Sequence, residues 1–330
     1  SMYKQPKFWR DKNSKISIFL IPISIIYYFF FSVVTRLKKE KRIPLPTICV
    51  GNIVMGGSGK TPLTIALRKI LSKKFNNIFV LIRGYGGSLS HAKIVDNRDD
   101  SSSVGDEALI HAEEGFTCVS KNRIDGAHLC LQENANLLIL DDGLQSKHIK
   151  KDLSFMVIDS IYQLGNGRIF PSGPLRESLQ SGIQKVDAIF LIGNKKIIFD
   201  ISSLRNKPIF YAKKIVKIPK IKSKNIYAFC GIGFPDNFFE ALYTKGLNIV
   251  KKKYFEDHHT YKDKEIEEII DFSKNRKLEI LTTKKDIIKI DHKFWKYINV
   301  VDLKIKVESE KKILDFCLKK IESSQKSHLK

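Results

Sequence analysis

Acidic residues and cysteines are scarce in this chain. Its 330 residues include 58 Lys and Arg but only 35 Asp and Glu, which gives a formal net charge of +23 at pH 7. The five cysteines are scattered and form no C-x-x-C pair, so we expect buried, reduced thiols, no disulfide and no metal cluster. No arginine-rich tract and no basic stripe with interleaved aromatic residues occurs, so we expect no nucleic-acid partner. The positive charge then favours anionic lipids or acidic substrates as partners, or it reflects a general enrichment in Lys, Ile and Asn.

One long apolar segment lies close to the N-terminus. Residues 16–34 are almost unbroken apolar sequence, with Pro22 inside and basic residues on both sides. The segment approaches the length of about 20 residues that a transmembrane helix needs, and no signal-peptide cleavage site follows it. A spanning helix, a helix that lies in the membrane interface and a buried core helix are the alternatives. Tyr27 and Tyr28 at its centre favour the interfacial helix, and we expect residues 1–36 to be membrane-associated.

A glycine-rich loop follows the first strand-length run. Thr47 to Val50 is the apolar run, Gly56-Gly57-Ser58-Gly59-Lys60-Thr61 is the loop, and a helix with apolar periodicity comes next. The glycines let backbone N–H groups converge on phosphate oxygens, and the helix N-terminus adds its partial positive charge. We expect Lys60 to bridge the β- and γ-phosphates of ATP and Thr61 to bind Mg²⁺. Val54 stands where the usual P-loop has its first glycine, so this is a variant P-loop, typical of a nucleotide phosphohydrolase or kinase.

The remaining sequence alternates between strand-length apolar runs and helical stretches. The runs at 78–82, 135–140, 155–158 and 188–192 predict an α/β fold with a doubly wound parallel sheet of the P-loop NTPase type. A further strand, turn and helix start at Ile226 and predict a second, smaller α/β domain.

These patterns divide the chain into four parts. We expect the membrane-associated helix at 1–36, and the P-loop domain at 37–211, rejoined by 308–330. The smaller α/β domain is expected at 221–297. Residues 212–220 and 298–307 both alternate apolar and polar side chains, so we expect them to pair as a two-stranded hinge.

Paired acids end one of the predicted strands. The apolar run at 137–140 leads directly into Asp141, Asp142 and Gly143. On its own this is the sequence of a turn. In a P-loop protein, however, the acid that orients Mg²⁺ stands at such a strand end, so we expect Asp141 in that role and Asp142 as the second candidate.

Four further motifs carry reactive side chains next to predicted strands or turns. The segment RGYGG at 83–87 and the segment GPLRE at 173–177 suit either loop structure or phosphate contact. Asp106, in the segment GDE, suits either a helix cap or a catalytic carboxylate. In the segment DHH at 257–259, adjacent histidines are a poor metal site, so an Asp or His that accepts a proton fits better.

Taken together, these motifs resemble those of the tetraacyldisaccharide 4'-kinase family, the membrane-associated lipid A 4'-kinases. The resemblance rests on GN-x-x-x-GG-x-GKTP at 51–62, RGYGG at 83–87, GDE at 105–107, DDG-x-Q at 141–145, GPLRE at 173–177 and DHH at 257–259. It implies transfer of the ATP γ-phosphate to the 4'-hydroxyl of a tetraacylated disaccharide 1-phosphate, which yields lipid IVA. It also implies a lipid disaccharide substrate, contact with anionic lipids at the cytoplasmic face of the bacterial inner membrane, and no obligate protein partner.

The resemblance also assigns roles to residues. It implies that Asp106 and His258 form the base that takes the proton of the sugar hydroxyl once the two domains close. The implied nucleotide-binding set is Gly56, Gly57, Ser58, Gly59, Lys60, Thr61, Arg176 and Glu177, and the implied metal-binding set is Thr61, Asp141 and Asp142. Lys284 departs from the family pattern, because a glutamate is expected there. The alternative to a kinase is a membrane-attached P-loop ATPase switch that acts through a protein partner.

Overall fold

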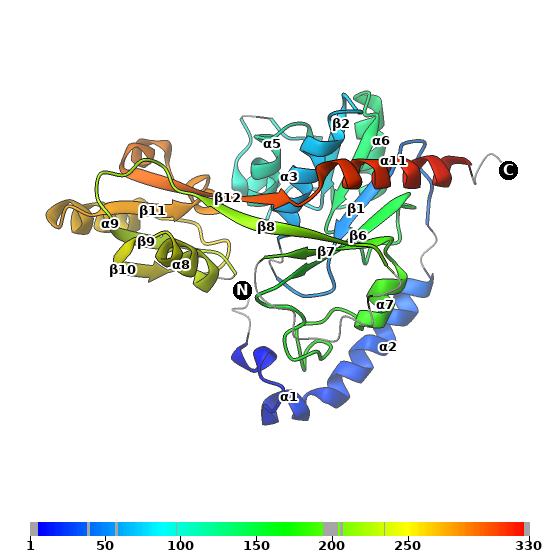
Figure 1. The fold of residues 1–330 in the computed structure, drawn as a ribbon, viewed down its shortest axis with the longest axis horizontal. Helices are drawn as coiled ribbons and strands as arrows, with labels where there is room; N and C mark the ends of the chain where they lie inside the picture. Colours follow the sequence, from blue (N-terminus) through cyan, green and yellow to red (C-terminus); the bar gives the residue numbers. More distant parts are fainter. Residues whose placement is uncertain are drawn as a thin grey trace.

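The computed structural model describes residues 6–37, 40–56, 59–96, 98–193, 204, 207–233 and 235–326. Its centre is one twelve-stranded, mostly parallel sheet with the strand order β10-β9-β11-β12-β8-β7-β6-β1-β5-β2-β4-β3 (Figure 1). Separate apolar cores lie on the two faces of the sheet, as expected where helices cover both faces. The predicted α/β fold class is therefore confirmed.

The first half of the sheet holds the glycine-rich loop. The strand β1 (Thr47–Gly51) lies between β5 (Leu137–Asp141) and β6 (Leu153–Asp159), and all three are parallel. These strands are buried along their whole length, which is why their sequences read as continuous apolar runs. The rest of this half comprises β2 (Ile78–Ile82), β3 (Lys93–Ile94), β4 (Thr117–Val119) and β7 (Ala188–Ile192).

Helices α3 (Lys60–Leu71) and α11 (Glu310–Lys326) cover one face of this half, together with α5 (Asp106–Ala112). Helices α6 (Arg123–Gln132) and α7 (Leu179–Gln184) cover the other. The short helix α4 (Ser101–Val104) leads into α5 through Gly105. The C-terminal helix thus packs on the half of the sheet that contains β1.

The second half of the sheet has its own helices and cores. Its strands are β9 (Asn225–Cys230), β10 (Asn248–Tyr254) and β11 (Glu279–Thr283), all parallel. Its helices are α8 (Pro235–Thr244), α9 (Asp263–Asn275), α10 (Lys284–Ile287) and the 3-10 helix η3 (His292–Tyr297). Two further apolar clusters lie on the two faces of these strands, separate from those of the first half.

Two long strands join the halves. Strand β12 (Ile298–Val307) pairs in parallel with β11 over its first four residues and then antiparallel with β8 (Ile209–Lys217). The antiparallel register runs from Asp302 opposite Lys217 to Val307 opposite Ala212. Strand β8 in turn pairs with β7, so the sheet continues from one half into the other.

The N-terminal apolar segment is divided between two helices. The 3-10 helix η1 (Lys7–Arg10) precedes α1 (Lys15–Phe19) and α2 (Ile21–Leu37), and the chain turns at Leu20. Pro22 falls in the first turn of α2, where its missing N–H is tolerated. Within the described part of the chain, no helix combines the length and apolarity needed to cross a bilayer.

Each helix turns one serine inward, and both turn large apolar side chains outward. The Ser17 and Ser24 side chains are buried, whereas large apolar side chains are exposed along the same helices. These exposed residues are Ile16, Ile18, Phe19, Ile23, Ile25, Ile26, Phe29, Phe30, Val33, Val34 and Leu37. The segment is therefore not a core helix, because its apolar surface is not covered by the protein.

Hydrogen bonds to one loop hold these helices in place. Ser17 Oγ donates to the carbonyl of Ser172 at 2.6 Å, and Ser24 Oγ donates to the carbonyl of Ile169 at 2.9 Å. The backbone N–H of Ser172 donates back to Ser24 Oγ at 3.0 Å. Trp9 is buried beside this loop, and its Nε1 donates to the carbonyl of Pro171 at 2.9 Å. These hydrogen bonds, together with the packing of the Tyr27 and Trp9 rings against Phe170, attach the N-terminal helices.

The variant Ser24→Val tests this attachment. It leaves the Ser172 N–H without its partner, while the Ile169 carbonyl keeps the hydrogen bond from the Gly173 N–H, and an unsatisfied buried group costs about 1–3 kcal/mol. We expect faster limited proteolysis at residues 16–37 than in the wild type. Ser32→Val makes the same change on α2 outside this network and serves as the control. Equal cleavage rates in the two variants would contradict the attachment.

Candidate active site

The glycine-rich loop connects β1 to the start of α3. Gly59 is the residue before α3 and has a positive φ of 80°, and Gly56 has a φ of 99°. Both values favour glycine. Lys60 and Thr61 are the first two residues of α3, at the helix end that attracts anions. Gly57 and Ser58, which were also predicted to bind nucleotide, lie outside the described residues.

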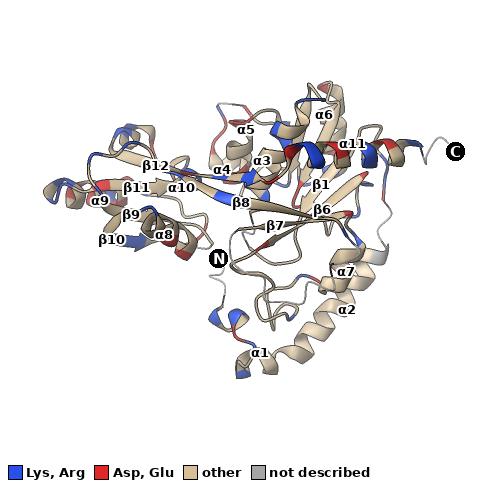
Figure 2. Cartoon of the chain, in the orientation of Figure 1, with Lys and Arg blue, Asp and Glu red and all other residues tan. Residues whose placement is uncertain are grey.

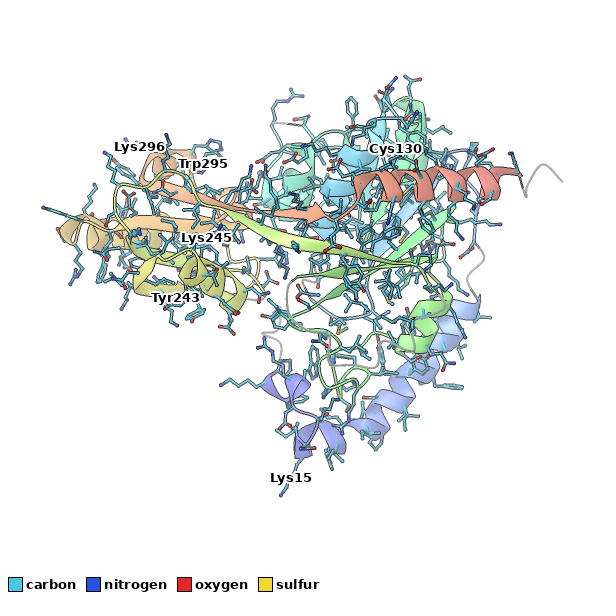
Figure 3. The ribbon with its side chains drawn as sticks, in the orientation of Figure 1. Lys15, Cys130, Tyr243, Lys245, Trp295 and Lys296 are labelled. Carbon is cyan, nitrogen blue, oxygen red and sulfur yellow. The ribbon has the colours of Figure 1, made fainter. Side chains whose placement is uncertain are left out.

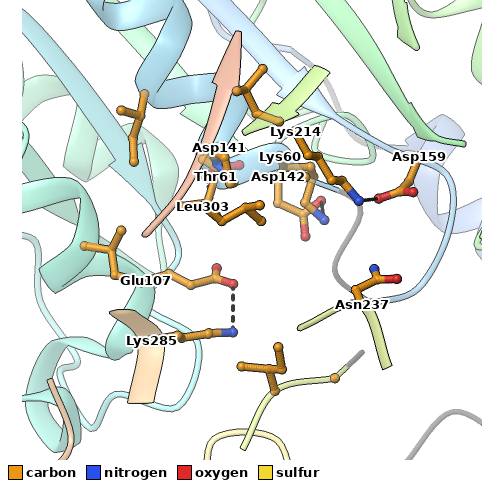
Figure 4. Close-up of a pocket in the computed structure, with 18 of the residues that line it drawn as sticks. Lys60, Thr61, Glu107, Asp141, Asp142, Asp159, Lys214, Asn237, Lys285 and Leu303 are labelled. Atoms are coloured by element: carbon orange, nitrogen blue, oxygen red, sulfur yellow. Dashed lines mark hydrogen bonds and ion pairs between the residues drawn. The ribbon is translucent and has the colours of Figure 1, made fainter. Parts of the chain in front are cut away.

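A large open cleft of about 1960 Å³ extends from this loop to the second half of the protein. Residues from both halves line it, including Lys60 and Asp141 from the first and His258 and Lys285 from the second. Figure 4 shows Lys60 and Thr61 beside the two acids that end β5, and Glu107 facing Lys285. The predicted site residues that line the cleft therefore come from segments far apart in the sequence.

Asp141 lies next to Thr61 at the end of β5. Thr61 Oγ1 donates to Asp141 Oδ2 at 3.2 Å, and the ring nitrogen Nε2 of His111 lies 2.8 Å from the same oxygen. The other oxygen, Oδ1, is buried and has no hydrogen-bond partner among the described residues. Mg²⁺ takes one or two protein oxygens and fills its other positions with water and phosphate. The Thr61 hydroxyl and the unpaired Asp141 Oδ1 fit such an ion.

Asp142 has different partners. Arg176 Nη1 donates to Oδ1 at 3.0 Å and Arg176 Nη2 donates to Oδ2 at 3.1 Å, while Lys60 Nζ lies 3.3 Å from Oδ1. Burial raises the pKa of Asp142, but Lys60 and Arg176 outweigh this effect and hold that pKa well below its usual value. Asp142 therefore stays ionised and neutralises two cations of the cleft, which makes Asp141 the better metal candidate.

Glu177 does not lie on the surface of the cleft. Its side chain is fully buried, and its carboxylate accepts hydrogen bonds from Ser181 Oγ at 2.6 Å, from Gln145 Nε2 at 3.3 Å and from Lys185 Nζ. Gln145 in turn accepts a hydrogen bond from Arg176 at 3.1 Å. The expectation that Glu177 binds nucleotide directly therefore has no support from the structure, because burial removes it from contact with a ligand.

Arg123, the first residue of α6, was not singled out by the sequence. It is buried, and its guanidinium donates to the backbone carbonyls of Asp142 at 2.8 Å and Asp141 at 3.2 Å. It thereby fixes the turn that holds both acids. The sequence carried no signal for this role, because a buried arginine at a helix start looks like any exposed one.

Asp106 and His258 meet across the two halves. Asp106 is the first residue of α5, its side chain is 2% exposed, and its Oδ2 lies 2.8 Å from His258 Nδ1. Lys285 Nζ and Lys289 Nζ lie 3.8 and 4.0 Å from the same oxygen. Burial raises the pKa of Asp106, but the contact with His258 and the two lysines together lower it below the usual value.

Further ion pairs connect α5 to the second half. Lys285 Nζ lies 3.4 Å from Glu107 Oε1. Lys284 Nζ lies 2.7 Å from Glu113 and 3.5 Å from Glu114, near the C-terminal end of α5. The lysine at the position where the motif comparison expected a glutamate is therefore paired with acids of the other half.

Comparison with known proteins decides the family. A family model described as tetraacyldisaccharide-1-P 4'-kinase matches residues 16–322. The chain belongs to this family. The tetraacyldisaccharide 4'-kinase of Paramagnetospirillum magneticum is 37% identical over 292 residues, which cover 87% of this chain and 89% of that one. The enzyme of the same name from Bradyrhizobium diazoefficiens is 34% identical over 297 residues, 87% of each chain.

A solved structure of the family has the same fold. The crystal structure of LpxK from Aquifex aeolicus in complex with ATP superposes with a TM-score of 0.74 at 26% identity. The superposition covers 93% of this chain and 99% of that chain. The sequence motifs resembled those of the tetraacyldisaccharide-1-P 4'-kinase family, and this resemblance is confirmed over nearly the whole chain.

Replacing Arg123 tests its role in the acid turn. Arg123→Met leaves the carbonyls of Asp141 and Asp142 without their donor, and hydrogen bonds from a charged group contribute about 1.5–3 kcal/mol each. We expect the free energy of unfolding to fall by at least about 2 kcal/mol, measured by urea denaturation. Arg83→Met is the matched control, since Arg83 is exposed at the end of β2. An Arg123→Met variant as stable as this control would contradict the role.

Proposed function

We propose that this chain is an ATP-dependent kinase that phosphorylates the 4'-hydroxyl of a tetraacyldisaccharide 1-phosphate, the step that forms lipid IVA in lipid A biosynthesis. Membership of the tetraacyldisaccharide-1-P 4'-kinase family supports the reaction. The observation that carries the mechanism is the 2.8 Å contact between Asp106 and His258, at a cleft that also holds Lys60 and Thr61. The proposed base and the proposed phosphate-binding loop then lie at the same cleft.

The phosphates of ATP are proposed to bind at the start of α3. The backbone of the loop around Gly56 and Gly59 surrounds them, and Lys60 contacts the β- and γ-phosphates. Thr61 and Asp141 hold Mg²⁺, which when bound neutralises charge on the phosphate oxygens. Among the described residues, the unpaired Asp141 Oδ1 beside the Thr61 hydroxyl supports this assignment.

Arg176 and Lys60 are proposed to reach the transferred phosphoryl group. Both are paired with the Asp142 carboxylate in this structure, so both are already oriented toward the cleft. Incoming phosphate oxygens compete with Asp142 for these two cations. If the Asp142 carboxylate keeps one contact with each side chain, it still holds Lys60 and Arg176 in position. Phosphoryl transfer depends mainly on such positioning and charge neutralisation.

The Asp106 and His258 pair is proposed to accept the proton of the sugar hydroxyl. A sugar hydroxyl does not ionise unaided near neutral pH, and a positioned base contributes on the order of 100- to 10,000-fold. The lowered pKa of Asp106 keeps its carboxylate ionised, so the carboxylate can orient His258 and stabilise it once it holds the proton. The pair is assembled from two halves of the protein, which ties the chemistry to their closure.

We further propose the domain division that closure requires. Residues 37–211 and 308–330 form the P-loop domain, and residues 221–297 form the smaller domain. Residues 212–220 and 298–307 serve as the hinge, which is supported by the antiparallel pairing of β8 with β12 between the halves. In such closures a few residues in loops or at the ends of elements absorb the change in φ and ψ.

The lipid substrate implies a membrane site, and we propose that residues 1–36 lie at the cytoplasmic face of the bacterial inner membrane. The outward apolar side chains of α1 and α2 support this, and Figure 2 shows α2 almost free of charged residues. Lys12 before the helices, Lys15 at the start of α1, and Lys41 and Arg42 after the helices are exposed and suit anionic lipid headgroups. Figure 3 shows Lys15 pointing away from the rest of the protein. We propose neither a nucleic-acid partner nor an obligate protein partner.

An acceptor assay tests the function. Purified protein with Mg-ATP, detergent and tetraacyldisaccharide 1-phosphate is expected to form a phosphorylated lipid, detected by transfer of labelled γ-phosphate. Asp106→Ala and His258→Ala are each expected to lower kcat by at least about tenfold, within the range of general-base catalysis, while ATP affinity changes little. His259→Ala is the control, because His259 pairs with Glu265 instead.

Each outcome has a definite meaning. Absence of lipid product from the wild type would overturn the kinase function, and slow ATP hydrolysis alone would be the behaviour of a nucleotide switch. Wild-type turnover in Asp106→Ala or His258→Ala would remove that residue from the base.

The pH dependence of the reaction tests the charges around Asp106. Lys289→Met removes a positive charge 4.0 Å from Asp106 Oδ2, so the pKa of Asp106 rises. Activity needs the Asp106 and His258 pair in the form that can accept a proton. Loss of a neighbouring positive charge favours the protonated form of the pair, so the acid limb of the kcat/KM profile shifts to higher pH. Lys293→Met is the control, because Lys293 is exposed and pairs with Asp263 and Asp291. An unshifted acid limb in Lys289→Met would contradict the assignment.

A further inference from the structure

His111 is a fully buried histidine that no sequence motif identified. It lies in the last turn of α5, five residues after Asp106, and its side chain has no exposed surface. Its Nε2 lies 2.8 Å from Asp141 Oδ2. Because a carboxylate oxygen accepts, the ring hydrogen lies on Nε2 and His111 is the donor. The other ring nitrogen, Nδ1, has no hydrogen-bond partner among the described residues.

This contact determines which oxygen of Asp141 is available. Oδ2 receives both the His111 N–H and the Thr61 hydroxyl, at 2.8 and 3.2 Å. Two donors on one oxygen fix the rotation of the carboxylate. Oδ1 is then the oxygen left without a protein partner in the part of the chain that the structure describes.

His111 is itself held by the helix that begins at the glycine-rich loop. Arg68, on α3, is buried, and its guanidinium donates to the backbone carbonyl of His111 at 3.0 Å and to that of Ile78 at 3.1 Å. Helix α3 therefore carries Lys60 and Thr61 at one end and fixes the position of His111 further along. Arg68 thus holds the backbone of His111, while the Nε2 of its side chain contacts the acid.

We propose that His111 is a positioning residue that orients the Asp141 carboxylate for the metal ion and links the helix that carries Asp106 to the metal site. The proposal rests on the proposed function, since it takes Asp141 as the acid that holds Mg²⁺. Helix α5 contacts the base partner His258 at its first turn, through Asp106, and the metal acid at its last turn, through His111. A rotation of α5 would change both contacts at once.

Two substitutions distinguish a positioning role of His111 from a purely structural one. His111→Gln keeps an N–H donor near the position of Nε2, whereas His111→Leu fills the space without a donor. Outer-shell partners of metal ligands typically change metal affinity by about 10- to 100-fold. We expect His111→Leu to weaken Mn²⁺ binding to the complex with a non-hydrolysable ATP analogue by about that factor, and His111→Gln to restore most of it.

The measurement is Mn²⁺ binding by electron paramagnetic resonance, combined with the thermal midpoint of each variant without metal. In the kinase assay, the Mg²⁺ concentration for half-maximal rate is expected to rise in His111→Leu more than kcat falls. His128→Leu on α6 is the matched control, because His128 is exposed and lies outside this cluster. It is expected to bind Mn²⁺ as the wild type does.

Two results would overturn the proposal. Wild-type Mn²⁺ affinity in His111→Leu would show that the donor does not act on the metal site. Equal losses of Mn²⁺ affinity and thermal midpoint in the Gln and Leu variants would show that the histidine is structural only. Failure of the proposed function is distinct from both: a wild type that binds Mn²⁺ with the ATP analogue but forms no lipid product loses the kinase function, while the His111 comparison still stands.

Discussion

The turn at the end of β5 brings two carboxylates together. The arrangement of most of the cleft depends on the side chains that neutralise the negative charge of each one. Asp141 is bonded by Thr61 and His111, and Asp142 is bonded by Arg176 and lies beside Lys60. Adjacent carboxylates repel each other unless each has its own cations or donors. Here the partners come from different elements, so neutralising the acids also fixes the relative positions of those elements. The proposed metal site at Asp141 and the cations proposed to contact phosphate at Asp142 thus lie on neighbouring residues.

The contacts across the cleft are of unequal strength. The pairs of Lys284 with Glu113 and Glu114 are partly exposed, and exposed ion pairs contribute about 0–1 kcal/mol each. The contact of Asp106 with His258 is almost fully buried and is surrounded by Lys285 and Lys289. Weak outer pairs together with one buried contact suit a cleft that must open to exchange substrates, because no single outer pair holds it shut.

The sequence predicted those features that depend on local pattern and missed those that depend on tertiary packing. Buried parallel strands are continuous apolar runs, so the sheet and the position of Asp141 at a strand end followed from the sequence. His111 and Arg123 were missed, because a polar residue on a short helix gives no sign that it faces a buried acid. The burial of Glu177 was not foreseen either: its motif places it beside Arg176, but its side chain points into the protein. The turn at Leu20 divides an apolar run that the sequence treats as continuous.

One loop connects the N-terminal helices to the segment before the glycine-rich loop. Residues 166–172 of this loop hold Ser17, Ser24 and Trp9. A few residues further on, the same loop bonds the segment before the P-loop, because Met55 N donates to Pro174 O at 2.8 Å and Arg176 N donates to Ile53 O at 2.7 Å.

A short, heavily bonded segment therefore lies between the apolar helices and the nucleotide loop. If those helices lie in the membrane interface, the headgroup of a lipid acceptor is brought close to Arg176 without leaving the bilayer. The acyl chains stay in an apolar environment while only the sugar enters the cleft, so the cost of transferring them into water does not arise. The position of these helices relative to the loop thus suits a substrate whose reactive end is polar and whose other end is a lipid.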